Sequence, residues 1–171
     1  MITKHTYGNP FNTEAVVEAV PNAEDAPAYG SVSLEKGFAF SYTMAAQDIV
    51  YGLGEAIRGI NKRGHLYVSN CSDTTDHHED MASMYGAHNF LIIDGEETFG
   101  LFFDYPTAIT FDIGYTLQDK LTVSCEEADL DLYVIDGENA YDIVKQFRKI
   151  IGRSYIPPKF AFGFGQSRWG Y

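Results

Sequence analysis

The sequence of 171 residues predicts a mainly β fold, an antiparallel β-sandwich followed by one helix. Short apolar runs recur along the chain and are separated by glycines, aspartates and charged pairs. Two of these runs, 88–94 and 98–104, are joined by the short glycine-containing segment 95–97, which is typical of a β-hairpin. In a further run, 128–135, aspartates alternate with leucines, which indicates a sheet with one face in water.

The elements before the hairpin are short. Residues 12–28 mix acids, alanines and two prolines, so we expect a loose connection there, with a short helical turn at 14–19. Turn residues bound each of the apolar runs that follow, and these runs are expected to form strands. The strands are expected over 30–34, 38–42 and 48–54, then in the hairpin, and then over 108–112, 121–125 and 128–135.

One helix is expected after the strands. Asn139 can cap it, and apolar residues recur at helical spacing from Tyr141 to Ile151. Gly152 then ends the pattern. We therefore expect a β-sandwich domain over residues 1–152.

Residues 153–171 are expected to be a separate unit. Pro157 and Pro158 mark a linker, and the apolar run over 160–167 has the composition of a new strand.

Composition excludes several classes of protein. Hydrophobic residues make up 45% of the chain and aromatic residues 15%, which is too much apolar material for a disordered protein. The formal charge of −12 would repel both a phosphate backbone and an anionic lipid surface, so we expect no nucleic-acid partner and no membrane partner. The chain starts without an apolar leader, and Cys71 and Cys125 are too few for a disulfide framework. A cytoplasmic protein with reduced thiols is the expectation.

Four stretches, in order, resemble the N-terminal part of family 31 glycoside hydrolases, the α-glucosidase family. The last of them is the most specific, because it resembles the entry of that family into the first strand of its catalytic barrel. The four stretches are YGLGE at 51–55, YGAHNF at 85–90, GLFFD at 100–104 and PPKFAFGFGQSRWGY at 157–171.

The resemblance implies a galactose-mutarotase-like sandwich packed against a (β/α)8 barrel, with 153–171 as the linker and the first barrel strand. In this family two barrel aspartates hydrolyse a terminal α-glucosidic bond of an oligosaccharide with retention, and retention needs two carboxylates about 5 Å apart. Both would lie beyond residue 171. We therefore assign no catalytic residue and no cofactor to this chain, expect it to be inactive alone, and expect its own barrel and an α-glucoside oligosaccharide as partners.

The densest polar stretch, residues 69–80, reads as a long irregular loop between two strands, and such loops often carry function. The resemblance implies that this loop reaches over the barrel mouth and that Asp73 hydrogen-bonds sugar hydroxyls, with Asp76 as the alternative. A carboxylate suits this role because it accepts several charge-assisted hydrogen bonds. A solvated loop acid is the structural alternative.

Other polar residues have simpler interpretations. The loop also contains Cys71, His77 and His78, but no metal-ligand spacing is present, so a solvated polar loop is favoured over a metal site. The cations and glycines of 58–64 match no phosphate-binding motif, and we expect this segment to anchor the loop.

Glycines and strand-end acids are also expected to be structural. Gly52 and Gly54 are interpreted as backbone-geometry positions. Asp94, Asp104 and Asp112 sit at strand ends, where a role in turns is expected.

Trp169 is the only tryptophan, and it follows the expected first barrel strand. Barrel active sites are built at strand ends, and aromatic faces stack on sugar rings, so Trp169 is a second candidate for substrate binding, with core packing as the alternative.

Two rival hypotheses remain open from the sequence. The chain could be a stand-alone carbohydrate-binding module that holds sugar on the sandwich. It could also form a homo-oligomer through an exposed apolar surface, because such surfaces attract partners.

Overall fold

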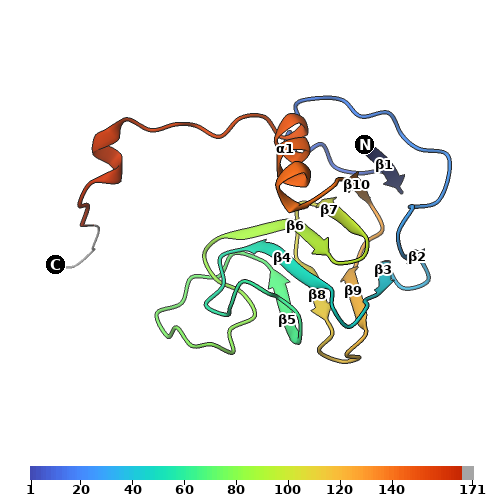
Figure 1. Cartoon of the computed structure of the whole chain (residues 1–171), viewed down its shortest axis with the longest axis horizontal. Coiled ribbons are helices and arrows are strands. Elements are labelled where there is room, and N and C mark those ends of the chain that lie inside the picture. The colour runs from blue at the N-terminus through green and yellow to red at the C-terminus, as the bar shows by residue number, and fades with distance from the viewer. Residues whose placement is uncertain (167–171) are drawn as a thin grey trace.

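The computed structural model describes residues 1–166 as a two-layer β-sandwich with one α-helix packed on its outside (Figure 1). The first sheet has five strands in the order β1-β10-β7-β6-β4, and the second has five in the order β2-β3-β9-β8-β5. All strand pairs within the sheets are antiparallel. The bounds are β1 Ile2–Tyr7, β2 Ser31–Ser33, β3 Phe38–Thr43, β4 Ile49–Gly54, β5 His65–Ser69, β6 Ala87–Asp94, β7 Thr98–Asp104, β8 Ile109–Ile113, β9 Lys120–Cys125, β10 Leu130–Asp136, α1 Ala140–Ile150 and the 3-10 helix η1 Lys159–Phe162.

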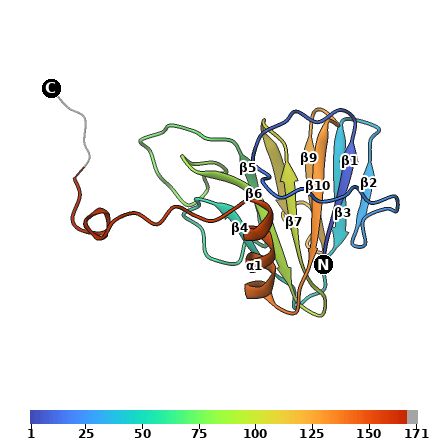
Figure 2. The ribbon, with the colours of Figure 1, turned by 90° about the horizontal axis from the view of Figure 1, so that it is seen from above.

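Two apolar cores hold the layers together. The larger core fills the space between the two sheets, and the smaller one lies between the first sheet and α1 (Figure 2). Strand β7 is buried on both faces because it borders both cores, whereas in β8 buried residues alternate with partly exposed ones. The predicted sandwich, hairpin and C-terminal helix are confirmed.

Helix α1 begins and ends with defined caps. The Asn139 side chain accepts a hydrogen bond from the Asp142 backbone N–H at 3.0 Å, which confirms the predicted N-cap. The apolar face of α1 buries Ile143, Phe147 and Ile150 against the first sheet. At its other end, the carbonyl of Ile150 accepts a hydrogen bond from the backbone N–H of Val17 at 2.7 Å.

The helical turn expected at 14–19 is wrong, because this segment caps α1 instead of forming a helix. The segment forms no helix, and Glu14 has a φ of 59°, which a right-handed helix excludes. A helix this short is not stable by itself. Its backbone N–H groups instead cap α1, and Val16 and Val20 pack on the smaller core.

Irregular segments cover the edge strands β1, β4 and β5, as is common in natural β proteins. Along β1, the backbone N–H of Ala23 donates to the Lys4 carbonyl at 2.7 Å. Along β4, the N–H of Lys62 donates to the Val50 carbonyl at 2.8 Å, and along β5 the N–H of Val68 donates to the Ala82 carbonyl at 2.8 Å. Strands β1 and β5 were not predicted. The sequence of β1, ITKHTY, is polar and alternates only weakly, and β5 is a run of only five residues.

Strand β4 contains a β-bulge between Gly52 and Gly54. The φ of Gly52 is +120°, and a Cβ there would lie 2.3 Å from the carbonyl oxygen of Phe90 in the neighbouring strand. Only glycine fits, which confirms the backbone role expected at this position.

The expected strand over 160–167 is not formed in its described part. Residues Lys159–Phe162 form the 3-10 helix η1 instead. A strand needs a neighbour for its backbone hydrogen bonds, and no strand within residues 1–166 pairs with this run. The division after residue 152 stays a prediction.

Two further observations bear on the sequence-based expectations. Within residues 1–166, neither helical segment combines the length and apolar character needed to cross a bilayer. Both cysteines are free thiols, with Cys71 exposed and Cys125 buried.

Candidate functional site

The polar loop predicted from the sequence joins β5 to β6, and we call residues 70–86 the β5–β6 loop. It projects from the sandwich on the same side as the segment that follows α1 (Figures 1 and 2). Its two arms are joined by a hydrogen bond from the Ser72 N–H to the Met84 carbonyl at 2.8 Å. At its C-terminal base, the Gly86 N–H donates to the Glu55 carboxylate at 2.9 Å.

Arg58 fastens the β5–β6 loop to the sandwich. Its Nε donates to the Glu79 carbonyl at 2.7 Å and its Nη1 to the Leu66 carbonyl at 3.0 Å. Its guanidinium also lies 5.3 Å from the ring centroid of Tyr67. The hydrogen bonds of Arg58 therefore support the anchoring role expected for segment 58–64.

The other cations of this segment also bind backbone carbonyls. Arg63 donates to the carbonyls of Asp48 and Gln118, at 3.2 and 3.1 Å. Lys62 is buried and donates to the Gly59 carbonyl at 3.0 Å, and desolvation lowers the pKa of its ammonium group. These donors are occupied within the protein, so the segment is structural rather than an anion site.

We expect Arg58→Ala to increase the rate of proteolytic cleavage within residues 70–86 by about tenfold or more, because two hydrogen bonds from a charged donor are lost. Limited proteolysis with mass spectrometry measures this rate. Arg153→Ala, an exposed position after α1, is the matched control. Equal cleavage rates in the two variants would show that Arg58 does not hold the loop.

Asp73 lies on the exposed part of the β5–β6 loop, and no hydrogen bond or ion pair joins its side chain to the rest of residues 1–166. Just after it the loop is braced, because Nε2 of His77 lies 3.2 Å from the Tyr85 hydroxyl and that hydroxyl donates to the Thr74 carbonyl. The Asp73 carboxylate thus has no hydrogen-bond partner within residues 1–166, on a loop that these contacts support. The alternative candidate Asp76 is also exposed, and Trp169 lies outside the described residues.

The metal alternative gains no support from the geometry. Among residues 1–166, no three His, Cys, Asp or Glu side chains converge as metal ligands. The ring of His77 instead packs edge-on against Tyr85, with centroids 5.5 Å apart.

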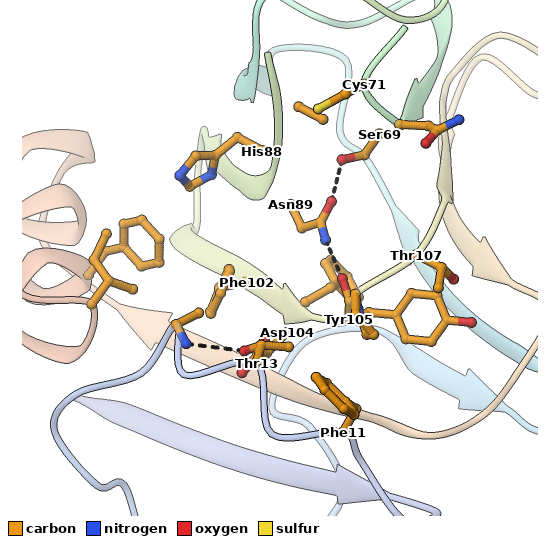
Figure 3. Close-up of a pocket in the computed structure, with 17 residues that line it drawn as sticks. Phe11, Thr13, Ser69, Cys71, His88, Asn89, Phe102, Asp104, Tyr105 and Thr107 are labelled. Carbon is orange, nitrogen blue, oxygen red and sulfur yellow. Dashed lines mark hydrogen bonds between the residues drawn. The ribbon is translucent and has the colours of Figure 1, made fainter. Parts of the chain in front are cut away.

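A pocket of about 700 Å³ opens at the N-terminal base of the loop (Figure 3). Its wall combines residues far apart in the sequence, from the N-terminal connection, the start of the loop, β6, the end of β7 and the end of α1. We call it the Asp104 pocket, and it is lined by Phe11, Thr13, Ala15, Ser69, Asn70, Cys71, Ala87, His88, Asn89, Phe102, Phe103, Asp104, Tyr105, Pro106, Thr107, Phe147 and Ile151. Asp73 is not part of this wall.

Hydrogen bonds fix the polar side chains of the Asp104 pocket. The Thr13 hydroxyl donates to Oδ1 of Asp104 at 2.6 Å. Nδ2 of Asn89 donates to the Tyr105 carbonyl at 3.1 Å, and Oδ1 of Asn89 accepts from the Ser69 hydroxyl (Figure 3). These contacts hold a carboxylate and an amide in defined orientations.

Desolvation shifts the pKa of two groups in the pocket. Desolvation raises the pKa of Asp104, with nearby Asp131 adding to the rise, while Thr13 and Lys4 oppose it. His88 is exposed, but its ring packs edge-on against Phe147, and desolvation lowers its pKa. The lowered pKa favours the uncharged imidazole of His88 near neutral pH.

The turn role expected for strand-end acids holds for Asp112 but not for Asp104. The carboxylate of Asp112 accepts from the backbone N–H of Tyr115 at 3.0 Å and of Thr116 at 3.2 Å. Asp104 points instead into the pocket, toward Thr13, because β7 ends where the N-terminal connection passes. No signal in the sequence distinguishes these two aspartates.

Comparison with known proteins places this sandwich among relatives. Residues 3–112 match the family model described as the glycosyl hydrolase 31 N-terminal galactose mutarotase-like domain. Alpha-glucosidase 2 of Bacillus thermoamyloliquefaciens is 32% identical over 80% of this chain and 19% of that enzyme. Alpha-xylosidase XylQ of Lactiplantibacillus pentosus is 26% identical over 71% of this chain and 15% of that enzyme. The chain therefore spans less than a fifth of the length of either relative.

A solved structure shares the fold. The glucose complex of a family 31 dextranase from Flavobacterium johnsoniae superposes with a TM-score of 0.71 at 22% identity, covering 78% of this chain and 16% of that one.

Proposed function

We propose that this chain, which belongs to the family of glycosyl hydrolase 31 N-terminal galactose mutarotase-like domains, is the non-catalytic sandwich of an α-glucosidase. In this proposal the sandwich works beside a (β/α)8 barrel that hydrolyses terminal α-linked glucose with retention. The β5–β6 loop reaches over the barrel and contributes Asp73 to the substrate cleft.

The relation to α-glucosidases carries the proposal. Identity to alpha-glucosidase 2 of Bacillus thermoamyloliquefaciens is 32% over 147 residues, against 26% over 121 residues for the α-xylosidase. We therefore propose α-glucosides as the substrate class. Xylosides are the second candidate, because a xylosidase is among the relatives.

The direction of the chain is consistent with this role. The β5–β6 loop and the segment after α1 leave the sandwich on the same side (Figures 1 and 2). A barrel continuing from that segment would lie on the side toward which the loop projects.

Exposed aromatic and aliphatic side chains mark the segment after α1 as a surface for another domain. Tyr155 and Ile156 are more than four-fifths exposed, and Phe160 is 82% exposed. A cluster of large apolar side chains exposed to water indicates a surface that another domain or protein covers.

The test is the gene and its product. We expect the reading frame to continue past codon 171 into a (β/α)8 barrel, and we expect the encoded enzyme to release α-glucose first from p-nitrophenyl α-glucoside, as retention requires. The chain of residues 1–171 alone should show no hydrolysis above the buffer rate. A stop codon after Tyr171, or hydrolysis by the chain alone, would contradict the proposal.

A further inference from the structure

We propose that the Asp104 pocket is a binding site for a neutral sugar, held by residues of the sandwich itself. The choice of α-glucosides as the sugars to test rests on the proposed function. The site rests on the shape, lining and hydrogen bonding of the pocket.

The size and walls of the pocket suit a disaccharide. Its volume of about 700 Å³ lies within the range of ordinary ligand sites, about 300 to 1,000 Å³. Phe11 is 69% exposed and offers its ring to a ligand, while Tyr105 is 7% exposed and forms part of the wall. Sugar rings bind through such aromatic faces together with a few fixed polar groups.

Polar groups of the right kind already point into this space (Figure 3). Thr13 occupies one oxygen of Asp104, and within residues 1–166 the other oxygen has neither a hydrogen bond nor an ion pair. Asn89 uses one N–H of its amide on the Tyr105 carbonyl and one lone pair of Oδ1 on the Ser69 hydroxyl, so one N–H and one lone pair remain. An ionised carboxylate accepts hydrogen bonds and an amide both accepts and donates, which matches vicinal sugar hydroxyls.

The charge environment favours a neutral, hydroxyl-rich ligand. Asp104 is half-buried and pairs across the sheet with Asp131, and the nearest cation, Lys4, lies 3.6 Å from Asp131. A second negative charge in the ligand would be repelled. A divalent cation would need several oxygen ligands from carboxylates or carbonyls, and Asp104 is the only acid of the described pocket wall.

A partly desolvated carboxylate is costly to keep ionised, because the charged form loses water contacts. The pKa of Asp104 is accordingly raised. In a folded protein, a raised carboxyl pKa means that ionisation destabilises the fold above that pKa, and that stability is regained as the pH falls through it. Sugar hydroxyls that donate to Asp104 would restore the lost hydrogen bonds.

The experiment is a ¹H–¹⁵N NMR titration of the chain with maltose and, separately, with isomaltose. We expect saturable shifts at the backbone amides of Asn89, Asp104 and Tyr105, with a Kd on the order of millimolar, as for a small ligand with few hydrogen bonds. Asp104→Asn should weaken binding by about tenfold, because charge-assisted bonds become neutral ones. Asp119→Asn makes the same chemical change at an exposed position in the β8–β9 turn and should leave the Kd unchanged.

Loss of binding in Asp104→Asn should not come from unfolding. The Thr13 hydroxyl can still donate to the amide oxygen, and the desolvated charge is gone, so the Tm of this variant should equal or exceed that of the parent chain. The Kd of the parent should also rise as the pH falls through the raised pKa of Asp104, a change absent from the Asn variant. His88 must be followed in the same spectra, because it faces the pocket and also titrates.

Three results would overturn the site. The first is the absence of chemical shift changes at 50 mM of either sugar, a concentration roughly ten times the expected Kd. The second is equal sugar affinity of the Asp104→Asn and Asp119→Asn variants. The third is a set of chemical shift changes confined to residues 72–85. None of them bears on whether a barrel follows in the reading frame, so failure of the site and failure of the proposed function are distinguishable.

Discussion

In the α-glucosidase to which we propose that this chain belongs, Asp73→Asn is expected to lower kcat/KM for maltose by about 10- to 100-fold. The reason is the loss of hydrogen bonds to a charged acceptor, each worth about 1.5 to 3 kcal/mol when its partner is left without one. The substitution keeps the size of the side chain and one acceptor oxygen. Because Asp73 is exposed and its side chain makes no hydrogen bond or ion pair within residues 1–166, its replacement should leave stability unchanged.

Steady-state kinetics on maltose, with thermal unfolding of each variant, checks this expectation. Asp76→Asn is the matched control, three positions along the same exposed loop, and should change kcat/KM by less than about twofold. A large loss in Asp76→Asn with none in Asp73→Asn would transfer the role to Asp76. Unchanged kcat/KM in both variants would show that the β5–β6 loop does not contact the substrate.

The expected elements were found where apolar residues follow a regular period. The hairpin of β6 and β7 and the capped helix α1 carry such patterns, and the structure confirms them. Strand β1 was missed because its sequence, ITKHTY, is polar and derives its stability from pairing with β10. Pairing between residues 2–7 and 130–135 is a long-range contact that local patterns do not contain.

The candidate site, too, could be predicted from the sequence only in part. Its loop could be located from composition, since residues 69–80 are polar and irregular, and Asp73 came from the family resemblance. The Asp104 pocket could not be predicted, because its wall joins Thr13, Asn89 and Asp104 with the end of α1. Asp104 and Asp112 look alike in the sequence, and only the path of the N-terminal connection separates a pocket acid from a turn acid.

The centre of the larger core should be the most sensitive part of the fold. Phe103, in β7, is fully buried, and its ring packs edge-on against the rings of Phe38, Phe40 and Phe111, with centroids 6.1, 6.0 and 5.8 Å away. The three partners belong to β3 and β8 of the opposite sheet. Phe103 therefore joins the two layers, and its loss would leave a cavity that neither sheet can close alone.

Phe103→Ala is accordingly expected to lower the free energy of unfolding by about 3 to 5 kcal/mol, the usual cost of truncating a buried phenylalanine. A domain of this size has about 5 to 15 kcal/mol in total, so the variant should be marginally folded at 37 °C. Urea unfolding checks this, with the midpoint shifted and the slope unchanged. The control, Phe160→Ala, makes the same change at a ring that is 82% exposed in η1 and should cost less than about 0.5 kcal/mol. Equal losses in the two variants would mean that Phe103 does not join the sheets, because only burial separates the two rings.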